Sequence, residues 1–497
     1  MPLNAENTEY GSLPGAGLSG GPGDAEAAPL FAPEPVQKWR PMSQEELEAV
    51  AGGPGWRKAR CYLVLLFWLS WLVILATAVA IIVLSPRPEA PELRWWQRTL
   101  FYQLRPQMFS PPGGSQGLSA LSEQLPFFSS LGIGALILEG LFDKKPSPLN
   151  LHGINEDMTT IQHLLSKSNK ANLKVVLDFC DLDLSGTQDD TGEERSNLSS
   201  STQHAVRFWL EQGVAGFSIC DSDEVYTEKT LLEWRTVFKE FGNQEEERIV
   251  LVKQTGDILL PQRTSSHSNI TLINVIMRSI LPQSHHLLTV QKVAEAIETH
   301  LQTQEEHIWL SWTIGGKVSR NLKRLLLVLT MTLPGSPVIQ HGEVDQIQNV
   351  SLPVNGKSDE QSDASAGEET STRSNLALFT SLSHSRAREE ALLYGSFTFL
   401  PFNTSNMIPS NSTAPSPTNP PILAFLRSWG CVHFIILLNV GPVPHALDPA
   451  WAQSLPEAGV FVSSTGQDRL GSTSLYALKL QPYEAIVIKL FQGGSYS

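Results

Sequence analysis

Residues 61–84 read CYLVLLFWLSWLVILATAVAIIVL, a run without a charged residue or a proline. At a helical rise of about 1.5 Å per residue this run is about 36 Å long, more than the roughly 30 Å of a bilayer's hydrocarbon core. A buried helix of a soluble domain rarely continues this far without a polar face, and the apolar part of a signal peptide is shorter and lies nearer the start of a chain. The run therefore predicts one transmembrane helix.

The sequons for N-glycosylation indicate which side of the membrane each end occupies. Basic residues on the two sides of the span nearly balance: Arg57, Lys58 and Arg60 precede it, and Arg87, Arg94 and Arg98 follow it. All the N-x-S/T sequons lie C-terminal to the span, at Asn197, Asn269, Asn349, Asn403 and Asn411. Because this modification marks surface loops of secreted regions, the pattern predicts a type II protein with an extracellular C-terminal region.

The segments next to the span are short and non-globular by composition. Residues 1–60 are expected to form a mostly disordered cytosolic tail, because their first two thirds are rich in Gly, Pro, Ala and Glu. Within that tail, Ser43 and Glu46 match a capping box, and Gly52 and Gly53 match a stop signal, so a short juxtamembrane helix is predicted. Prolines stiffen the expected neck over residues 85–94.

Beyond the neck, short apolar runs alternate with amphipathic stretches, which predicts a parallel barrel over residues 95–391. The expected strands are 135–138, 174–179, 216–220, 249–252, 308–312 and 336–340, and the expected helices are 118–131, 157–169, 202–212, 228–241, 290–302 and 318–331. Over residues 392–497 the pattern changes to short segments joined by turns, which predicts an antiparallel β domain of sandwich type; its expected strands are 396–400, 422–427, 433–439, 459–463 and 485–490. The polar stretches 353–375 and 403–421 are predicted to be surface loops.

Charge and cysteine content narrow the possible partners. The formal net charge of −14 argues against a nucleic acid, which would need a concentrated basic surface. The four cysteines match no metal-site spacing, so neither a metal nor a cofactor is predicted. One of them, Cys61, lies at the membrane boundary. At least one of the remaining three must therefore be free or pair with another chain.

Several motifs resemble the α-amylase family of glycoside hydrolases. Residues 101–109 (FYQLRPQMF), 125–133 (LPFFSSLGI) and 332–339 (TLPGSPVI), with Gly342-Glu343 after the last, are similar to that family's first strand, second-strand entry and eighth strand. The resemblance implies a (β/α)8 barrel, here without an inserted B domain, followed by an antiparallel β domain. This agrees with the alternation of strand and helix patterns.

The same resemblance places the family's three catalytic carboxyl groups on residues that are not acids. The nucleophile falls on Cys220, the general acid on Gln254 and the third carboxylate on Gly315, whereas the acid of the third strand is kept as Asp178. Because glycoside hydrolysis needs two opposed carboxyl groups, we expect no catalysis. A catalytic Cys220 would need a nearby base, and no such pairing is visible. A buried inert thiol, or a disulfide between Cys180 and Cys220, is favoured instead.

Residues 42–56 and the span also resemble the 4F2 cell-surface antigen heavy chain family, the glycoprotein subunits of heteromeric amino-acid transporters. This implies a non-catalytic plasma-membrane subunit that stabilises a multi-pass transporter light chain and brings it to the cell surface. The cysteine that links such subunits in the family is replaced by Pro88, which puts a covalent link in doubt.

Contact with the light chain and with lipid would involve the span itself, and the residues predicted to face the partner helix are Ser70, Ala76, Thr77 and Ala80. Their alternative is an ordinary lipid-facing role. Two other functions stay open: a membrane-anchored glycosidase, and an adhesion or signalling receptor component.

Overall fold

The computed structural model describes residues 43–84, 90–109, 117–142, 158–180, 182, 192–223, 226–242, 246–254, 271–281, 290–302, 308–315, 318–342, 363–400, 422–447, 455–466 and 469–491. The chain divides into two units, Met1–Arg87 and Pro88–Ser497, and each is described by itself.

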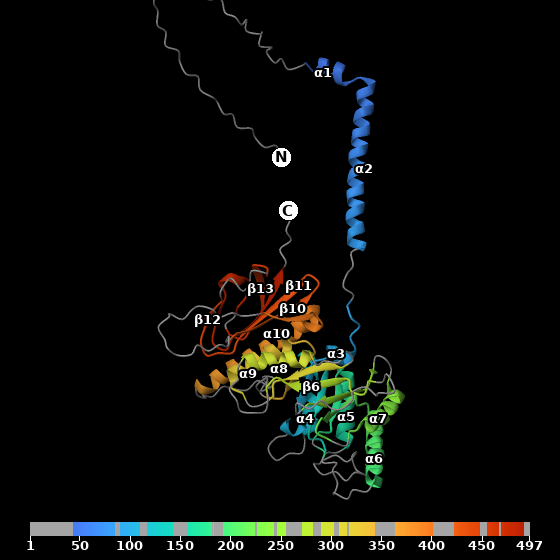
Figure 1. Cartoon of the computed structure of the whole chain (residues 1–497), viewed down its shortest axis with the longest axis vertical. Helices are drawn as coiled ribbons and strands as arrows, with labels where there is room; N and C mark the ends of the chain where they lie inside the picture. Colours follow the sequence, from blue (N-terminus) through green and yellow to red (C-terminus); the bar gives the residue numbers. More distant parts are fainter. Residues whose placement is uncertain are drawn as a thin grey trace, which may run out of the picture. The chain divides into compact units, whose positions relative to one another are not determined.

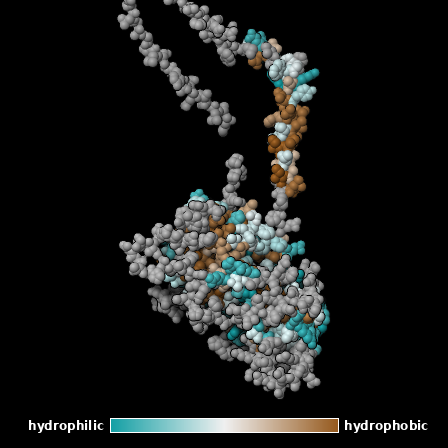
Figure 2. All heavy atoms as spheres, in the orientation of Figure 1, coloured by the Kyte–Doolittle hydropathy of each residue, from teal (hydrophilic) through white to brown (hydrophobic). Residues whose placement is uncertain are grey.

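The described residues of the first unit form two helices (Figure 1). Helix α1, Gln44–Ala51, is capped by Ser43 and Glu46 as the sequence predicts, and it ends at Gly52. Helix α2, Pro54–Leu84, is continuous over 31 residues and so begins seven residues before the predicted span. Its apolar stretch Gly55–Ile81 is the one segment, among the described residues, long and apolar enough to cross a membrane. Figure 2 shows hydrophobic side chains along most of its length.

The second unit begins with a closed parallel barrel in which the strands follow the order of the chain, β1 to β8. The strands are β1 Phe101–Leu104, β2 Ala135–Leu138, β3 Lys174–Asp178, β4 Gly216–Cys220, β5 Ile249–Lys253, β6 Val275–Ser279, β7 Trp309–Thr313 and β8 Ser336–Gln340. The helices around them are α3 Trp95–Arg98, α4 Gly117–Ser130, α5 Met158–Lys170, α6 Gly192–Glu211, α7 Glu228–Phe241, α8 Val290–Gln302, α9 Arg320–Thr332 and α10 Asp363–Arg388, and a 3-10 turn, η1, covers Pro106–Phe109. The predicted fold class is confirmed.

Strand β6 and helix α10 are two departures from the sequence prediction. Strand β6 was not among the predicted strands, because polar Arg278 and Ser279 end its short apolar run. The predicted surface loop over residues 353–375 is wrong from Asp363 onward, where α10 begins. The first half of α10 is polar and lacks helical periodicity. Its second half buries Leu378, Phe379 and Leu382, so tertiary packing holds a helix that local pattern does not reveal.

The antiparallel part follows α11, Glu390–Leu393, and its six-stranded sheet has the order β14-β13-β16-β11-β10-β9. The strands are β9 Ser396–Phe399, β10 Ile422–Trp429, β11 Val432–Asn439, β13 Ala458–Ser464, β14 Ser472–Ser474 and β16 Ala485–Phe491, with a separate pair β12 His445–Ala446 and β15 Lys479–Leu480 and a 3-10 turn, η6, at Leu475–Ala477. Figure 1 shows this sheet lying against α8, α9 and α10. The five predicted strands are confirmed.

Alternation along the barrel strands decides which side chains reach the interior. One hydrophobic cluster, which includes Phe101, Ile137, Val176 and Leu251, fills the barrel, whereas the intervening residues pack outward against the helices. Trp96 belongs to the interior cluster and is 4% exposed, so the residues just after the neck close the amino end of the barrel. The interior rows continue at the carboxyl ends of the strands into polar residues, and these form the mouth of the barrel.

Candidate functional site

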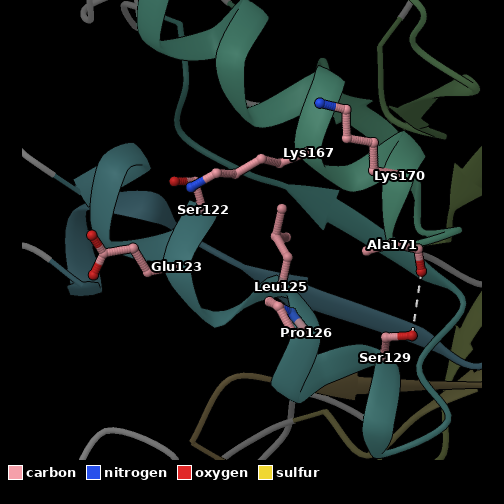
Figure 3. Close-up of a pocket in the computed structure, with 8 residues that line it drawn as sticks. All are labelled: Ser122, Glu123, Leu125, Pro126, Ser129, Lys167, Lys170 and Ala171. Atoms are coloured by element: carbon pink, nitrogen blue, oxygen red, sulfur yellow. Dashed lines mark hydrogen bonds between the residues drawn. The ribbon is translucent and has the colours of Figure 1, made fainter.

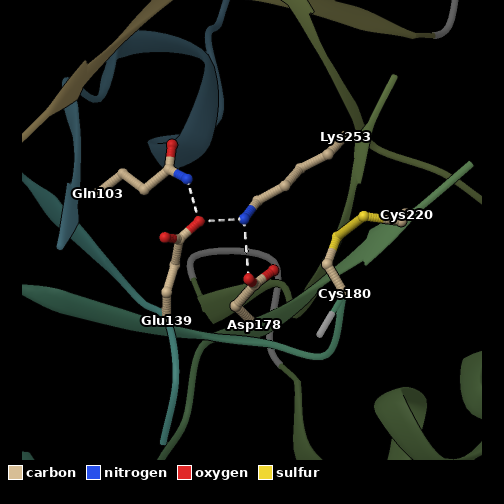
Figure 4. The surroundings of a disulfide bond; sticks show 6 residues. All are labelled: Gln103, Glu139, Asp178, Cys180, Cys220 and Lys253. Carbon is tan, nitrogen blue, oxygen red and sulfur yellow. Dashed lines mark hydrogen bonds and ion pairs between the residues drawn. A yellow bond between two sulfur atoms is a disulfide. The ribbon is translucent and has the colours of Figure 1, made fainter. Parts of the chain in front are cut away.

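The mouth of the barrel brings together polar and charged residues from four parts of the chain (Figure 4). Gln103, Asp178 and Lys253 continue the interior rows of β1, β3 and β5, two positions beyond Phe101, Val176 and Leu251. Glu139 follows β2 directly, and its backbone N–H donates to the carbonyl of Leu104 at 2.9 Å. Every second residue of a strand points to the same face, so these side chains converge.

Lys253 is the centre of this cluster. Its Nζ donates to Oε1 of Glu139 at 2.5 Å and to Oδ2 of Asp178 at 2.8 Å. Gln103 Nε2 also donates to Oε1 of Glu139, and Arg105 Nε donates to Oε2 at 3.2 Å. The side chains of Lys253, Glu139 and Asp178 are 12%, 14% and 2% exposed. One ammonium therefore occupies the space between two largely buried carboxylates.

Burial and ion pairing act in opposite directions on these groups. Burial alone would lower the pKa of Lys253, but Asp178 and Glu139 together raise it above its ordinary value. Burial alone would raise the pKa of Glu139, but Lys253, Gln103 and Arg105 bring it below its ordinary value. Asp178 is the most deeply buried, and burial raises its pKa more than Lys253 lowers it. The pKa of each of these three groups therefore depends on the charge of at least one of the other two.

A disulfide joins the ends of two neighbouring strands beside this cluster. Cys180, just past β3, is bonded to Cys220, the last residue of β4, and their Cα atoms are 4.9 Å apart. Cys220 is also in register with Lys253 of β5. Of the two alternatives favoured from the sequence, the disulfide is therefore confirmed. The other two cysteines, Cys61 and Cys431, are free and exposed.

The predicted counterparts of the other two catalytic positions also lie at this end of the barrel. Gln254 directly follows β5, and its N–H donates to the carbonyl of Met277 at 3.0 Å. Gly315 lies two residues past the end of β7 and has a φ of +70°. A Cβ atom added there would lie 1.7 Å from Oγ of Ser279 and 3.2 Å from the carbonyl oxygen of Leu281. Any side chain at this position would need a shift of Ser279 and a strained backbone.

Sequence reasoning missed Lys253 and Glu139. A signal was present in each case, because each is a charged residue that ends an apolar strand, and the carboxyl ends of barrel strands are where functional side chains gather. The arrangement differs from an acid/base pair. A general acid needs a transferable proton facing an open space, and here the space between the carboxylates holds the Lys253 ammonium.

The residues predicted on the span lie on exposed positions of α2. The hydroxyl of Ser70 donates to the carbonyl of Phe67 at 3.0 Å, and that of Thr77 donates to the carbonyl of Ile74 at 2.8 Å. Both hydroxyls are therefore satisfied within their own helix. Ala76 and Ala80 are small residues one turn apart. Among the sequons, Asn197 lies in α6 without a described side chain, and Asn269, Asn349, Asn403 and Asn411 lie outside the described residues.

A groove of about 650 Å³ lies on the outer wall of the barrel between α4 and α5 (Figure 3). Leu125 and Pro126 line it from α4, and Lys167 and Lys170 line it from α5. Figure 3 shows the Lys167 side chain extending towards Ser122. Pro126 cannot donate the helical hydrogen bond of its position, so α4 is locally weakened where the groove opens. The groove belongs to the helix layer and not to the mouth.

Comparison with known proteins gives a family match in the amino-terminal part and similarity to relatives over most of the chain. The family model described as solute carrier family 3 member 2 N-terminus matches residues 32–102. The amino acid transporter heavy chain SLC3A2 of Oryctolagus cuniculus is 27% identical over 92% of this chain and 88% of its own length. The amino acid transporter heavy chain SLC3A1 of Homo sapiens is 22% identical over 63% of this chain and 62% of its own length.

Similarity to solved structures concerns the fold alone. The isomaltulose synthase of Klebsiella sp. LX3 superimposes with a TM-score of 0.57 at 14% identity, over 80% of this chain and 100% of that one. A trehalulose synthase of Pseudomonas mesoacidophila gives a TM-score of 0.56 at 13% identity over the same shares. These sugar-converting enzymes share the amylase-like barrel architecture.

Proposed function

Because this chain is a relative of the amino acid transporter heavy chains, we propose that it is a non-catalytic ancillary subunit of an amino-acid transporter. In this role it associates with a multi-pass light chain, stabilises it and brings it to the plasma membrane. The observation that carries the proposal is similarity to a heavy chain over 92% of the chain, together with the separate match of residues 32–102 across the span. One transmembrane helix fits such a single-pass membrane protein.

The number of candidate spans supports the need for a partner. Transport requires several helices that enclose a polar site near the middle of the bilayer. Within the described part of the chain there is one candidate span, and it carries no charge from Cys61 to Leu84. An amino acid would therefore cross the membrane through the light chain.

The mouth of the barrel supports a non-catalytic role. The nucleophile position is the disulfide-bonded Cys220, and a side chain at Gly315 would collide with Ser279. Lys253 holds the nearby acids Glu139 and Asp178 in ion pairs. These features disfavour the alternative of a membrane-anchored glycosidase.

Association through α2 is proposed to use its face of small residues. At about 100° per residue, Ala76 and Ala80 lie on one side of the helix, and the aromatic group Phe67, Trp68 and Trp71 lies on the other. The ring centroids of Phe67 and Trp68 are 6.2 Å apart, and those of Trp68 and Trp71 are 6.0 Å apart. Small residues let helix backbones approach closely, so the alanine face suits a partner helix and the aromatic face suits lipid.

The association is proposed to be non-covalent. Pro88 stands where the heavy-chain resemblance places the linking cysteine, and the sequence has no cysteine between Cys61 and Cys180. Both Cys180 and Cys220 are used within the chain. Type II orientation follows from the sequons, which would carry glycans on the extracellular side.

Co-expression with candidate light chains tests the function. We expect the light chain to reach the cell surface only with this chain, and non-reducing gels to show no covalent dimer. The double variant Ala76→Leu/Ala80→Leu should weaken co-purification, whereas Ala78→Leu, on the aromatic side, should not. Full surface delivery of every light chain without this protein would contradict the proposal.

An assay of the purified ectodomain on maltose and starch oligosaccharides tests the alternative. We expect no hydrolysis. Hydrolysis that disappears on substitution of Cys220 or Gln254 would instead favour the glycosidase.

A further inference from the structure

The amino-terminal end of α2 carries a group of basic residues that the transporter role does not use. The helix continues without a break for seven residues ahead of the uncharged run, from Pro54 to Arg60. All the charged residues of α2 lie on this extension: Arg57, Lys58 and Arg60, here called the basic collar. Each of the three is exposed. Figure 2 shows hydrophilic side chains at this end of α2 and hydrophobic ones along the rest.

The spacing of the collar spreads its charges over one broad side of the helix. At about 100° per residue, Arg60 and Lys58 lie on either side of Arg57, and together the three cover roughly 160° of the circumference. Trp56, which is 56% exposed, lies about 40° from Arg60. A tryptophan beside basic residues at the end of a span is typical of the membrane–water interface.

The described residues do not neutralise the collar. No ion pair of Arg57, Lys58 or Arg60 is found among the described residues, and the sequence has no acidic residue between Glu48 and Glu89. On the amino-terminal side, the nearest carboxylate in the sequence is that of Glu48 on α1, before Gly52 and Gly53. Another carboxylate of α1, that of Glu46, accepts from the backbone of Ser43 in the helix cap. The charge of the collar is therefore available to an external anion.

We propose that the basic collar binds the phosphate-bearing head groups of anionic phospholipids in the leaflet next to it. The uncharged run that begins at Cys61 places the collar where the hydrocarbon core gives way to head groups. Guanidinium groups bind phosphate oxygens with two parallel hydrogen bonds, and Lys58 adds a third cation. The proposal requires α2 to span the membrane and does not depend on the transporter role.

The test measures lipid selectivity of the full chain reconstituted in bilayers of phosphatidylcholine with spin-labelled lipids. We expect phosphatidylserine to be enriched over phosphatidylcholine in the motionally restricted shell around the wild-type protein. Each charge removed should weaken the contact roughly fivefold, so Arg57→Gln/Lys58→Gln/Arg60→Gln should abolish the enrichment. Arg98→Gln, an exposed basic residue of α3, is the matched control and should retain it.

Two further arms keep the test decisive if the triple variant inserts poorly. Arg57→Lys/Arg60→Lys keeps the charge and should keep the enrichment, and added salt should reduce the enrichment of the unaltered protein. Soluble inositol hexakisphosphate, offered without a bilayer, distinguishes a free polyphosphate from a lipid. Equal amounts of phosphatidylserine and phosphatidylcholine in the motionally restricted shell of the wild-type protein would overturn the proposal. Binding of the soluble polyphosphate with the same affinity in the presence and absence of a bilayer would also overturn it. Light-chain delivery, measured separately, tests the transporter role and not this one.

Discussion

The Nζ atom of Lys253 on β5 lies 2.8 Å from Oδ2 of Asp178 on β3, so the two strands are joined across β4 at the mouth of the barrel. The same ammonium binds Glu139. In an enzyme of this architecture the mouth is open to substrate. Here the ammonium of Lys253 lies between the carboxylates of Glu139 and Asp178, and the contribution of these ion pairs to stability can be measured.

Replacing Lys253 with methionine should destabilise the ectodomain strongly. The variant leaves two largely buried carboxylates without their cation, and breaking a buried pair from one side costs about 3–5 kcal/mol. Chemical unfolding followed by tryptophan fluorescence measures the change. Arg105→Gln removes the exposed partner of Glu139 and should cost less than about 1 kcal/mol. An equal effect of the two variants would contradict the central role of Lys253.

Acid should weaken the contribution of Glu139. Its folded pKa lies below its ordinary value of 4.5, so its stabilisation is present above that value and is lost as the pH falls through the folded pKa. We therefore measure the free energy of unfolding at several pH values between neutral and acid. It should fall less steeply with falling pH for Glu139→Gln than for the unaltered protein. Parallel curves would mean that the pKa of Glu139 is the same in the native and the unfolded protein, which would contradict a stabilising ion pair in the mouth.

Removal of the disulfide should destabilise the barrel without changing its fold. Cys180 and Cys220 are separated by 40 residues, and closure of a loop of this length stabilises by about 4 kcal/mol in the chain-entropy description. Cys180→Ala/Cys220→Ala should lower the unfolding free energy accordingly, and Cys431→Ala should have little effect. Alkylation of the native full chain, followed by mass spectrometry, should label Cys61 and Cys431 alone.

Arg386 should be required for the junction between the barrel and α11, the helix that precedes the antiparallel sheet. Its guanidinium is fully buried and donates to the carbonyls of Met331, Leu333, Leu392 and Gly335. Arg386→Met leaves these acceptors unpaired, and each buried unpaired group costs about 1–3 kcal/mol. We expect a loss of several kcal/mol in unfolding experiments. Arg386→Lys should rescue little, because an ammonium cannot reproduce the planar fork.

Replacement of Trp96 should destabilise the amino end of the barrel. Trp96 is buried in the interior cluster, and its Nε1 donates to Oε2 of Glu247 at 3.3 Å. Trp96→Ala should cost about 3–5 kcal/mol because it leaves a cavity. Trp95→Ala, at the partly exposed neighbouring residue, should cost less. Thermal unfolding of the ectodomain compares the two.

Local patterns explain most of the successful predictions. The strands β2, β4 and β8 are bounded by turn residues and read as short apolar runs, so their positions follow from the sequence alone. The amphipathic helix α7 was predicted with its observed limits for the same reason. Prediction failed where the local pattern is weak, as in the polar first half of α10.

The sequence by itself determined the apolar helix that is long enough to cross a membrane, the barrel and the sheet that follows it, because hydrophobic length and periodicity act over neighbouring residues. It also brought Cys180 and Cys220 into consideration as a pair. Only the tertiary structure decided that Lys253 lies between Glu139 and Asp178, which are 114 and 75 positions away in the chain. Which charges meet in a closed barrel depends on strand register and on the inward or outward direction of each residue, and no local pattern encodes that.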